Sequence, residues 1–179
     1  MKLSNLILSL MISVSFIACA QPEPRKPLQK RSGSFMEDSA KRNKALYAQE
    51  ELEIKAFIQT QDNLREYRVS ESGFWYALEP RITDELLTPK TGDTVIFSFS
   101  VSDLNLNELI MADQNGWIEY LVDQSHQELI SGVREGIKLT QNKESIRLLL
   151  PSVMAYGYRG VPGVIQPNTP VLVDITRQN

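Results

Sequence analysis

Side chains that could perform acid, base or nucleophilic chemistry are scarce in this chain of 179 residues. It contains one histidine, His126, and one cysteine, Cys19, whereas nucleophilic catalysis needs a serine or cysteine beside a base. Asp103, Asp113 and Asp123 could supply paired carboxylates, but all three stand in turn-like sequences, where aspartate is common for structural reasons. We therefore expect no histidine-dependent triad, no metal centre and no cofactor.

Motifs for other common chemistries are missing as well. The sequence has no phosphate-binding loop, no zinc-protease helix and no cysteine-rich metal spacing. Its net charge of −3 gives no electrostatic reason to expect a nucleic-acid partner. If the chain is an enzyme, its reaction must proceed without a strong acid, base or metal ion.

One segment carries an unusual combination of residues. In PSVMAYGYRGVPGVIQP, residues 151 to 167, glycine and proline exclude a regular helix or strand. The loop is nevertheless rich in aromatic and aliphatic side chains, namely Tyr156, Tyr158, Val161, Val164 and Ile165. So much apolar surface on a loop indicates one wall of a cleft.

Rotation about an X-Pro peptide bond is a reaction that such a cleft can catalyse. The barrier is about 20 kcal/mol and no covalent bond breaks, so neither a nucleophile nor a metal is needed. Water stabilises the planar amide by bonding to its carbonyl, and the twisted amide is less polar. A dry apolar pocket with one or two hydrogen-bond donors therefore favours the transition state.

The elements that would position this loop can be read from the residue pattern. The stretch 39–60 lacks Gly and Pro and predicts a helix, with Tyr47, Ile54 and Phe57 on one side and Glu50 interrupting the apolar stripe. Strands are predicted at residues 74–78, 91–104, 109–111, 117–122, 145–150 and 171–176, and a short helix at 131–139. An Asp-Gln-Asn-Gly turn separates the third strand from the fourth. The fold class expected is α+β, a curved antiparallel sheet of five to six strands around one short helix, preceded by an N-terminal helix.

The N-terminal residues predict export and anchoring. Residues 1–18 read as a signal peptide, with Lys2 before an apolar run too short to span a bilayer comfortably. A cysteine directly after this run indicates a bacterial lipoprotein signal, with Cys19 as the lipidated residue, although an ordinary signal with an incidental cysteine is the alternative. Residues 19–38 then form the lipidated cysteine and a flexible tether, 39–66 a helical segment and 67–179 the main domain.

The C-terminal half of the chain resembles a known family. The stretches ELISGVREGIKL, SIRLLLP and AYGYRGVPGVIQPNTPVLVDI are similar, in order and spacing, to the FKBP-type peptidyl-prolyl isomerases, and KTGDTVIFSFS resembles the family's first core strand. The similarity covers about residues 88 to 176. The lipoprotein start, the N-terminal helix and the SGFWY strand further resemble the FKBP-type lipoproteins associated with gliding motility in Bacteroidetes.

The resemblance implies a proline pocket between the short helix and the sheet. Carried over by position, the hydroxyl of Tyr156 and the backbone N–H of Ile130 would bond carbonyls of the substrate. The apolar lining would comprise Phe99, Ile110, Val133, Val161, Ile165 and Val173. Val133 stands where the family usually has Trp, Ile110 and Met111 replace a Phe-Asp pair, and Val173 replaces a Phe.

These replacements leave two functions open. The first is a membrane-anchored isomerase that acts on proline-containing polypeptides and assists the folding of exported or envelope proteins. The second is a chaperone or binding module that keeps the fold with little activity. For either, we expect a lipid anchor at Cys19, a place in the cell envelope at an outer membrane facing the periplasm, and a possible homodimer through the N-terminal helix.

Overall fold

The computed structural model describes residues 33–79 and 88–178. Two compact units divide the chain, Met1–Met36 and Glu37–Asn179, and the sheet and its core belong to the second. The predicted signal peptide, the predicted lipidation site Cys19 and the first part of the predicted tether lie outside the described residues. Within the described ranges, no helix combines the length and the apolar character needed to cross a membrane.

Helix α2 spans Gly33–Thr60. Its end agrees with the sequence, but it begins at Gly33 and not at Ser39, so residues 33–38 are helical and do not belong to an extended tether. The reason is that no proline interrupts these residues, and a helix that is already nucleated continues until a residue stops it.

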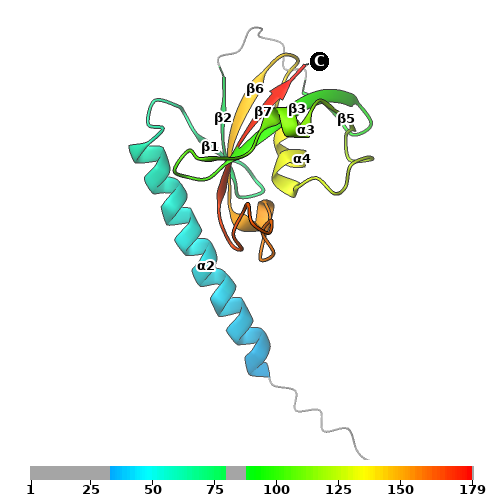
Figure 1. Ribbon diagram of the computed structural model, residues 1–179. Coiled ribbons are helices and arrows are strands. Elements are labelled where there is room, and N and C mark those ends of the chain that lie inside the picture. Colours follow the sequence, from blue (N-terminus) through cyan, green and yellow to red (C-terminus); the bar gives the residue numbers. More distant parts are fainter. Residues whose placement is uncertain (1–32, 80–87, 179) are drawn as a thin grey trace, which may run out of the picture. The chain divides into compact units, whose positions relative to one another are not determined.

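The main domain is built on one antiparallel sheet (Figure 1). The sheet contains seven strands: β1 Arg68–Val69, β2 Trp75–Leu78, β3 Thr94–Ser102, β4 Glu108–Ile110, β5 Ile118–Leu121, β6 Ser145–Leu150 and β7 Val171–Arg177. They follow the order β1-β2-β6-β7-β3-β4, and β5 also pairs with β3. The six predicted strands are present, and the two-residue β1 is additional.

Alternation along β3 separates the two faces of the sheet. Val95, Phe97, Phe99 and Val101 are buried, whereas the residues between them are partly exposed. The pattern confirms the period of two expected from the sequence. Side chains of the same face on β6 and β7 join these residues in one core cluster.

Helix α4, Ser131–Ile137, packs on the core face of the sheet. Two glycines, Gly132 and Gly136, make this contact possible because a Cβ atom on either would meet Leu150 or Leu148 of β6. The helix backbone can therefore approach the strand closely. The short helix predicted from the sequence thus lies against the sheet as expected (Figure 1).

The opposite face of the sheet receives the C-terminal half of α2. Ile54 and Phe57 are buried against Leu149 of β6 and Leu172 of β7, in a second and smaller core cluster. Ile54 and Phe57 are three positions apart, and this spacing puts both side chains on one face of the helix. Helix α2 is therefore part of the packed structure and not only a spacer.

The segment between β4 and β5 differs from its prediction. Residues Ala112–Asn115 form a one-turn helix, α3, where a turn was expected. The glycine of that turn, Gly116, ends the helix with a φ of 65° and donates its N–H to the carbonyl of Ala112 at 2.9 Å. The sequence therefore predicted the position of the chain reversal correctly, but the residues before Gly116 form one turn of helix.

Candidate active site

The floor of the candidate site is formed by the start of α4. Ile130 precedes the helix with φ −57° and ψ 141°, and its carbonyl accepts the N–H of Val133 at 3.1 Å. Val133 is fully buried, and Ile130 is partly exposed. The N–H of Ile130 has no hydrogen-bond partner among residues 33–79 and 88–178, so it is available as a donor.

The loop from Pro151 to Pro167 is held by its own backbone. It opens with a 3-10 turn, Ser152–Met154, and the N–H of Gly157 then returns to the carbonyl of Ser152 at 2.8 Å. Further on, Val161 and Ile165 form a bridge with N–H···O distances of 2.8 Å in both directions. These bonds give the loop one defined shape, although it has no regular secondary structure.

Tyr156 is the central side chain of this loop. It is partly buried and packs against the main core cluster, and this burial raises the pKa of its hydroxyl above the ordinary value. The hydroxyl therefore stays protonated and keeps its ability to donate. No hydrogen-bond partner for it occurs in the described part of the chain. Tyr156 and Ile130 thus present two unpaired donors.

A direct bond ties the two sides of the site together. Ser131, the first residue of α4, donates its hydroxyl to the carbonyl of Met154 at 3.3 Å. Met154 precedes Tyr156 by two residues, and Ser131 follows Ile130 directly. The bond therefore places the loop beside the helix start, and the two unpaired donors lie in the same region of the molecule.

The wall of the site comes from the sheet. Phe99 of β3 is 6% exposed, and its neighbour Val101 pairs with both Ile110 of β4 and Val173 of β7. The carbonyl of Phe99 accepts the side-chain amide of Asn115 at 2.7 Å, which fastens α3 over β3. The wall is consequently aliphatic, with one aromatic ring.

All predicted pocket residues share the main core cluster of the domain. Each belongs to the main core cluster or packs against it, namely Phe99, Ile110, Ile130, Val133, Tyr156, Val161, Ile165 and Val173. Four of these residues are buried, namely Phe99, Val133, Ile165 and Val173. The other four are partly exposed, namely Tyr156, Ile130, Ile110 and Val161. A ligand would therefore meet these four first, and the buried residues support them. The catalytic roles assigned to them from the sequence stay predictions.

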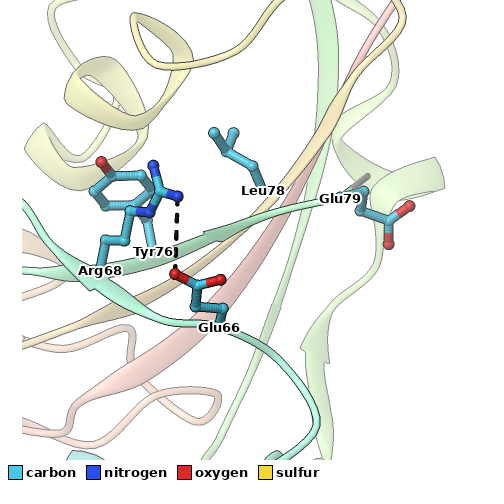
Figure 2. A pocket seen from close by; sticks show the side chains of 5 residues that line it. All are labelled: Glu66, Arg68, Tyr76, Leu78 and Glu79. Atoms are coloured by element: carbon cyan, nitrogen blue, oxygen red, sulfur yellow. Dashed lines mark ion pairs between the residues drawn. The ribbon is translucent and has the colours of Figure 1, made fainter. Parts of the chain in front are cut away.

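A separate hollow lies elsewhere on the domain (Figure 2). It measures about 270 Å³ and is lined by Glu66, Arg68, Tyr76, Leu78 and Glu79, none of which was predicted to belong to the site. Figure 2 shows Arg68 paired with Glu66, a contact of 3.8 Å between two exposed side chains. Three of its five lining residues are charged, and although Tyr76 and Leu78 pack against the main core cluster, none of the five is a predicted pocket residue. We therefore place the candidate site at Tyr156.

Sequence reasoning missed two residues that organise the site. The sequence predicts a turn at Asn115, and at Ser131 only the start of a helix. Both act through contacts with backbone carbonyls that are distant in sequence, so no local pattern could reveal them. No cluster of three or more potential metal ligands occurs among the described residues.

The fold and the site define a class of small α+β domains in which an antiparallel sheet wraps one helix. Solved structures with this architecture include FkpA from Escherichia coli, with a TM-score of 0.54, 20% identity, and coverage of 98% of this chain and 80% of that one. A peptidyl-prolyl cis-trans isomerase from Pseudomonas syringae pv. tomato gives a TM-score of 0.58 at 17% identity, covering 76% and 93% of the two chains. These similarities confirm the predicted fold.

Sequence comparison identifies the family within that class. The family model of the FKBP-type peptidyl-prolyl cis-trans isomerases matches residues 87–176. FK506-binding protein 1 from Saccharomyces cerevisiae is 31% identical over 87 residues, which are 49% of this chain and 75% of the yeast protein. FK506-binding protein 2A from Rhizopus delemar is 39% identical over 51 residues, 28% of this chain and only 30% of the relative. The chain belongs to the FKBP-type peptidyl-prolyl cis-trans isomerase family, as the sequence predicted.

Proposed function

We propose that this chain is a membrane-anchored peptidyl-prolyl cis-trans isomerase that assists the folding of exported or cell-envelope proteins. The observation that carries the isomerase part is the pair of unpaired donors, the Tyr156 hydroxyl and the Ile130 N–H, at the edge of an apolar cluster. A proline side chain fits an apolar surface, and the two donors can hold the carbonyls that flank it.

Catalysis would follow from this arrangement without any group being ionised. The apolar wall excludes water from the X-Pro amide, and loss of water bonding to its carbonyl weakens the resonance that keeps the bond planar. Donors fixed by the fold hold neighbouring carbonyls while the bond turns, so little reorganisation is needed at the transition state. Each tenfold gain in rate requires about 1.4 kcal/mol of such differential stabilisation.

An isomerase assay on a soluble form of the chain, residues 33 to 179, tests this function. The rate should exceed the uncatalysed rate for at least some peptides in a series that varies the residue before proline. Equal rates with and without the protein for every peptide would overturn the enzymatic proposal. The signal should also vanish after heat denaturation, which controls for a contaminating isomerase that is more heat-resistant.

A second candidate function rests on the aliphatic wall. Ile110 and Val173 line the region around Val101, and Val133 forms the floor, so a chaperone or binding module with little activity is the alternative. It predicts that the chain suppresses aggregation of an unfolded protein, and that Tyr156→Phe leaves this suppression intact. An active isomerase whose rate falls in Tyr156→Phe favours the first function.

The anchor is the second part of the proposal. A cysteine that follows an apolar run of signal-peptide length supports lipidation at Cys19, with the domain in the cell envelope, at an outer membrane and facing the periplasm. The resemblance to gliding-motility lipoproteins supports a client in that machinery. Labelled palmitate should enter the wild-type chain but not Cys19→Ala, and equal labelling of both would contradict the anchor.

Helix α2 offers a surface for a second copy of the chain. Its C-terminal half packs on the sheet, whereas Tyr47, with 42% of its surface exposed, and Leu52, with 62%, belong to neither core cluster. We propose a homodimer through this part of the helix. Sedimentation of residues 33 to 179 should give a dimer that Tyr47→Glu weakens, and a monomer at all concentrations would contradict it.

A further inference from the structure

Glu50 is a buried acidic residue that the proposed chemistry does not use. It is 1% exposed on α2, and it lies on the side of the helix that also carries Ile54 and Phe57. Residues at i, i+4 and i+7 share one helix face, so Glu50 occupies a position where an apolar side chain would be expected. Burying a carboxyl group is costly unless it is hydrogen-bonded, so its partner is informative.

That partner is Ser152, at the beginning of the loop that carries Tyr156. One carboxyl oxygen of Glu50 accepts the backbone N–H of Ser152 at 2.8 Å, and the other accepts its hydroxyl at 2.6 Å. Ser152 is itself 2% exposed, so both bonds are shielded from water. Both oxygens of a side chain on α2 are therefore committed to a single residue of the loop.

Ser152 in turn fixes both neighbours of Tyr156. Its carbonyl accepts the N–H of Ala155 at 3.0 Å and the N–H of Gly157 at 2.8 Å. Ala155 and Gly157 flank Tyr156 in sequence, so the position of Ser152 sets the backbone on either side of the tyrosine. A continuous chain of hydrogen bonds thus runs from Glu50 through Ser152 to the peptide units around Tyr156.

We propose that Glu50 is a positioning residue for the Tyr156 hydroxyl, and that α2 is a working part of the active site. The inference rests on the proposed isomerase function. It assigns to the helix a task beyond holding the domain away from a membrane. Small displacements of a catalytic group lower rates strongly. An enzyme whose loop is released from Glu50 therefore turns over substrate more slowly, even though its pocket residues are unchanged.

Two substitutions separate positioning from simple helix docking. Glu50→Leu keeps the volume of the side chain and suits the apolar surroundings, but it cannot accept the two hydrogen bonds. Glu50→Gln keeps both contacts, because its oxygen accepts the Ser152 N–H and its amide can donate to the Ser152 hydroxyl. If Glu50 only docks the helix, Glu50→Leu is at least as active as Glu50→Gln.

The decisive experiment measures kcat/KM of the full chain. We expect about a tenfold loss for Glu50→Leu and nearly full activity for Glu50→Gln. Glu53→Leu, the same change at an exposed position of α2, should be neutral. Ile54→Ala, which loosens helix docking but leaves the Ser152 bonds, should change stability more than kcat/KM. Wild-type activity in Glu50→Leu would overturn the proposal.

A double-mutant cycle tests whether the loss is transmitted through Tyr156. In the Tyr156→Phe background, Glu50→Leu should cost less than about twofold, because the group that it positions is already gone. A full additional tenfold loss would show that Glu50 acts on the enzyme in another way, and the proposal would fail.

Amide hydrogen exchange provides a readout that needs no enzymatic activity. Glu50→Leu should accelerate exchange at Ser152 and Gly157 by about tenfold or more, while the amides of β6 and β7 stay protected. If the chain shows no isomerase activity but this exchange pattern appears, the positioning contact stands and the proposed function fails. Unchanged exchange at both residues would overturn the positioning role itself.

Discussion

Gly160 lies so close to the backbone of Ile165 that no Cβ atom fits between them. A methyl group at Gly160 would collide with the carbonyl oxygen of Ile165 and with the adjoining peptide unit of Gln166 and Pro167. Gly160 also has a φ of 61°, a conformation that side chains disfavour. The loop can therefore bring Ile165 back to the core only because residue 160 is a glycine.

This contact predicts a contrast between two glycines of the same loop. Gly160→Ala should destabilise the domain by about 2 to 4 kcal/mol and lower kcat/KM, because the backbone of residues 165–167 must move. Gly163→Ala has a similar φ of 76° but meets no atom within 4 Å, so only the strain of about 1 kcal/mol remains. Urea unfolding compares the two, and equal losses would contradict the steric account.

Arg147 and Asp174 form a contact on the face of the sheet opposite α4, and we expect this contact to stabilise the domain. They stand directly opposite each other on β6 and β7, joined by two hydrogen bonds of 2.7 and 2.8 Å, and Arg147 also reaches Asp62 at 3.0 Å. Arg147→Lys keeps the charge but cannot make the paired bonds, so we expect a loss of about 1 kcal/mol.

A matched change at an exposed arginine is the control for Arg147→Lys. Arg68 meets Glu66 at 3.8 Å with both side chains largely exposed, and Arg68→Lys should change the free energy of unfolding by less than about 0.5 kcal/mol. Chemical denaturation at low salt measures both variants. Losses of equal size would show that the geometry of the Arg147 contact contributes nothing.

The pKa of Tyr67 leads us to expect that the stability of the domain changes at alkaline pH. Burial, followed by the hydrogen bond and the charge of Asp62, raises the pKa of Tyr67 well above its ordinary value. Because the folded state holds this proton more tightly, the stabilisation is complete below the unfolded pKa of about 10 and is lost as the pH rises above it.

The variant Tyr67→Phe isolates this effect. It should be about 1 kcal/mol less stable than the wild type near neutral pH, since the bond to Asp62 is lost. The difference should shrink above about pH 10, because Tyr67 then ionises in the unfolded wild type but not in the folded one. Phenylalanine has no proton to lose, so the stability of the variant is not affected in this way. Denaturation midpoints across this range measure it, and a constant difference would be inconsistent with the raised pKa.

The sequence was sufficient to predict the strands of the sheet, because a strand buried on one face has apolar residues at every second position. Val95, Phe97, Phe99 and Val101 are all buried, and the residues between them, Ile96, Ser98 and Ser100, are partly exposed. The two-residue strand β1 left no such pattern, because both Arg68 and Val69 are exposed. The early start of α2 was missed since residues 33–38 carry no apolar stripe, while nothing in them stops a helix.

The sequence predicts the members of the candidate site but not the residues that support them. Tyr156, Ile130 and the apolar lining are assigned from the family resemblance, whose short motifs follow one another in order along residues 88 to 176. Glu50 was visible only as an interruption of an apolar stripe, because its partner Ser152 is 102 residues away. Contacts over such separations depend on the packed fold, so a polar residue on a buried face is the strongest signal that the sequence can offer.

The most direct test of the account compares two tyrosines on one loop. Tyr156 is partly buried beside the core cluster with an unpaired hydroxyl, whereas Tyr158 is 73% exposed and accepts a hydrogen bond from Arg159 at 3.0 Å. The measurement is kcat/KM for a proline-containing peptide with the wild type, Tyr156→Phe and Tyr158→Phe. We expect about a tenfold loss, or ~1.4 kcal/mol, for Tyr156→Phe and no loss for Tyr158→Phe. Full activity of Tyr156→Phe in a chain that catalyses the reaction would contradict it.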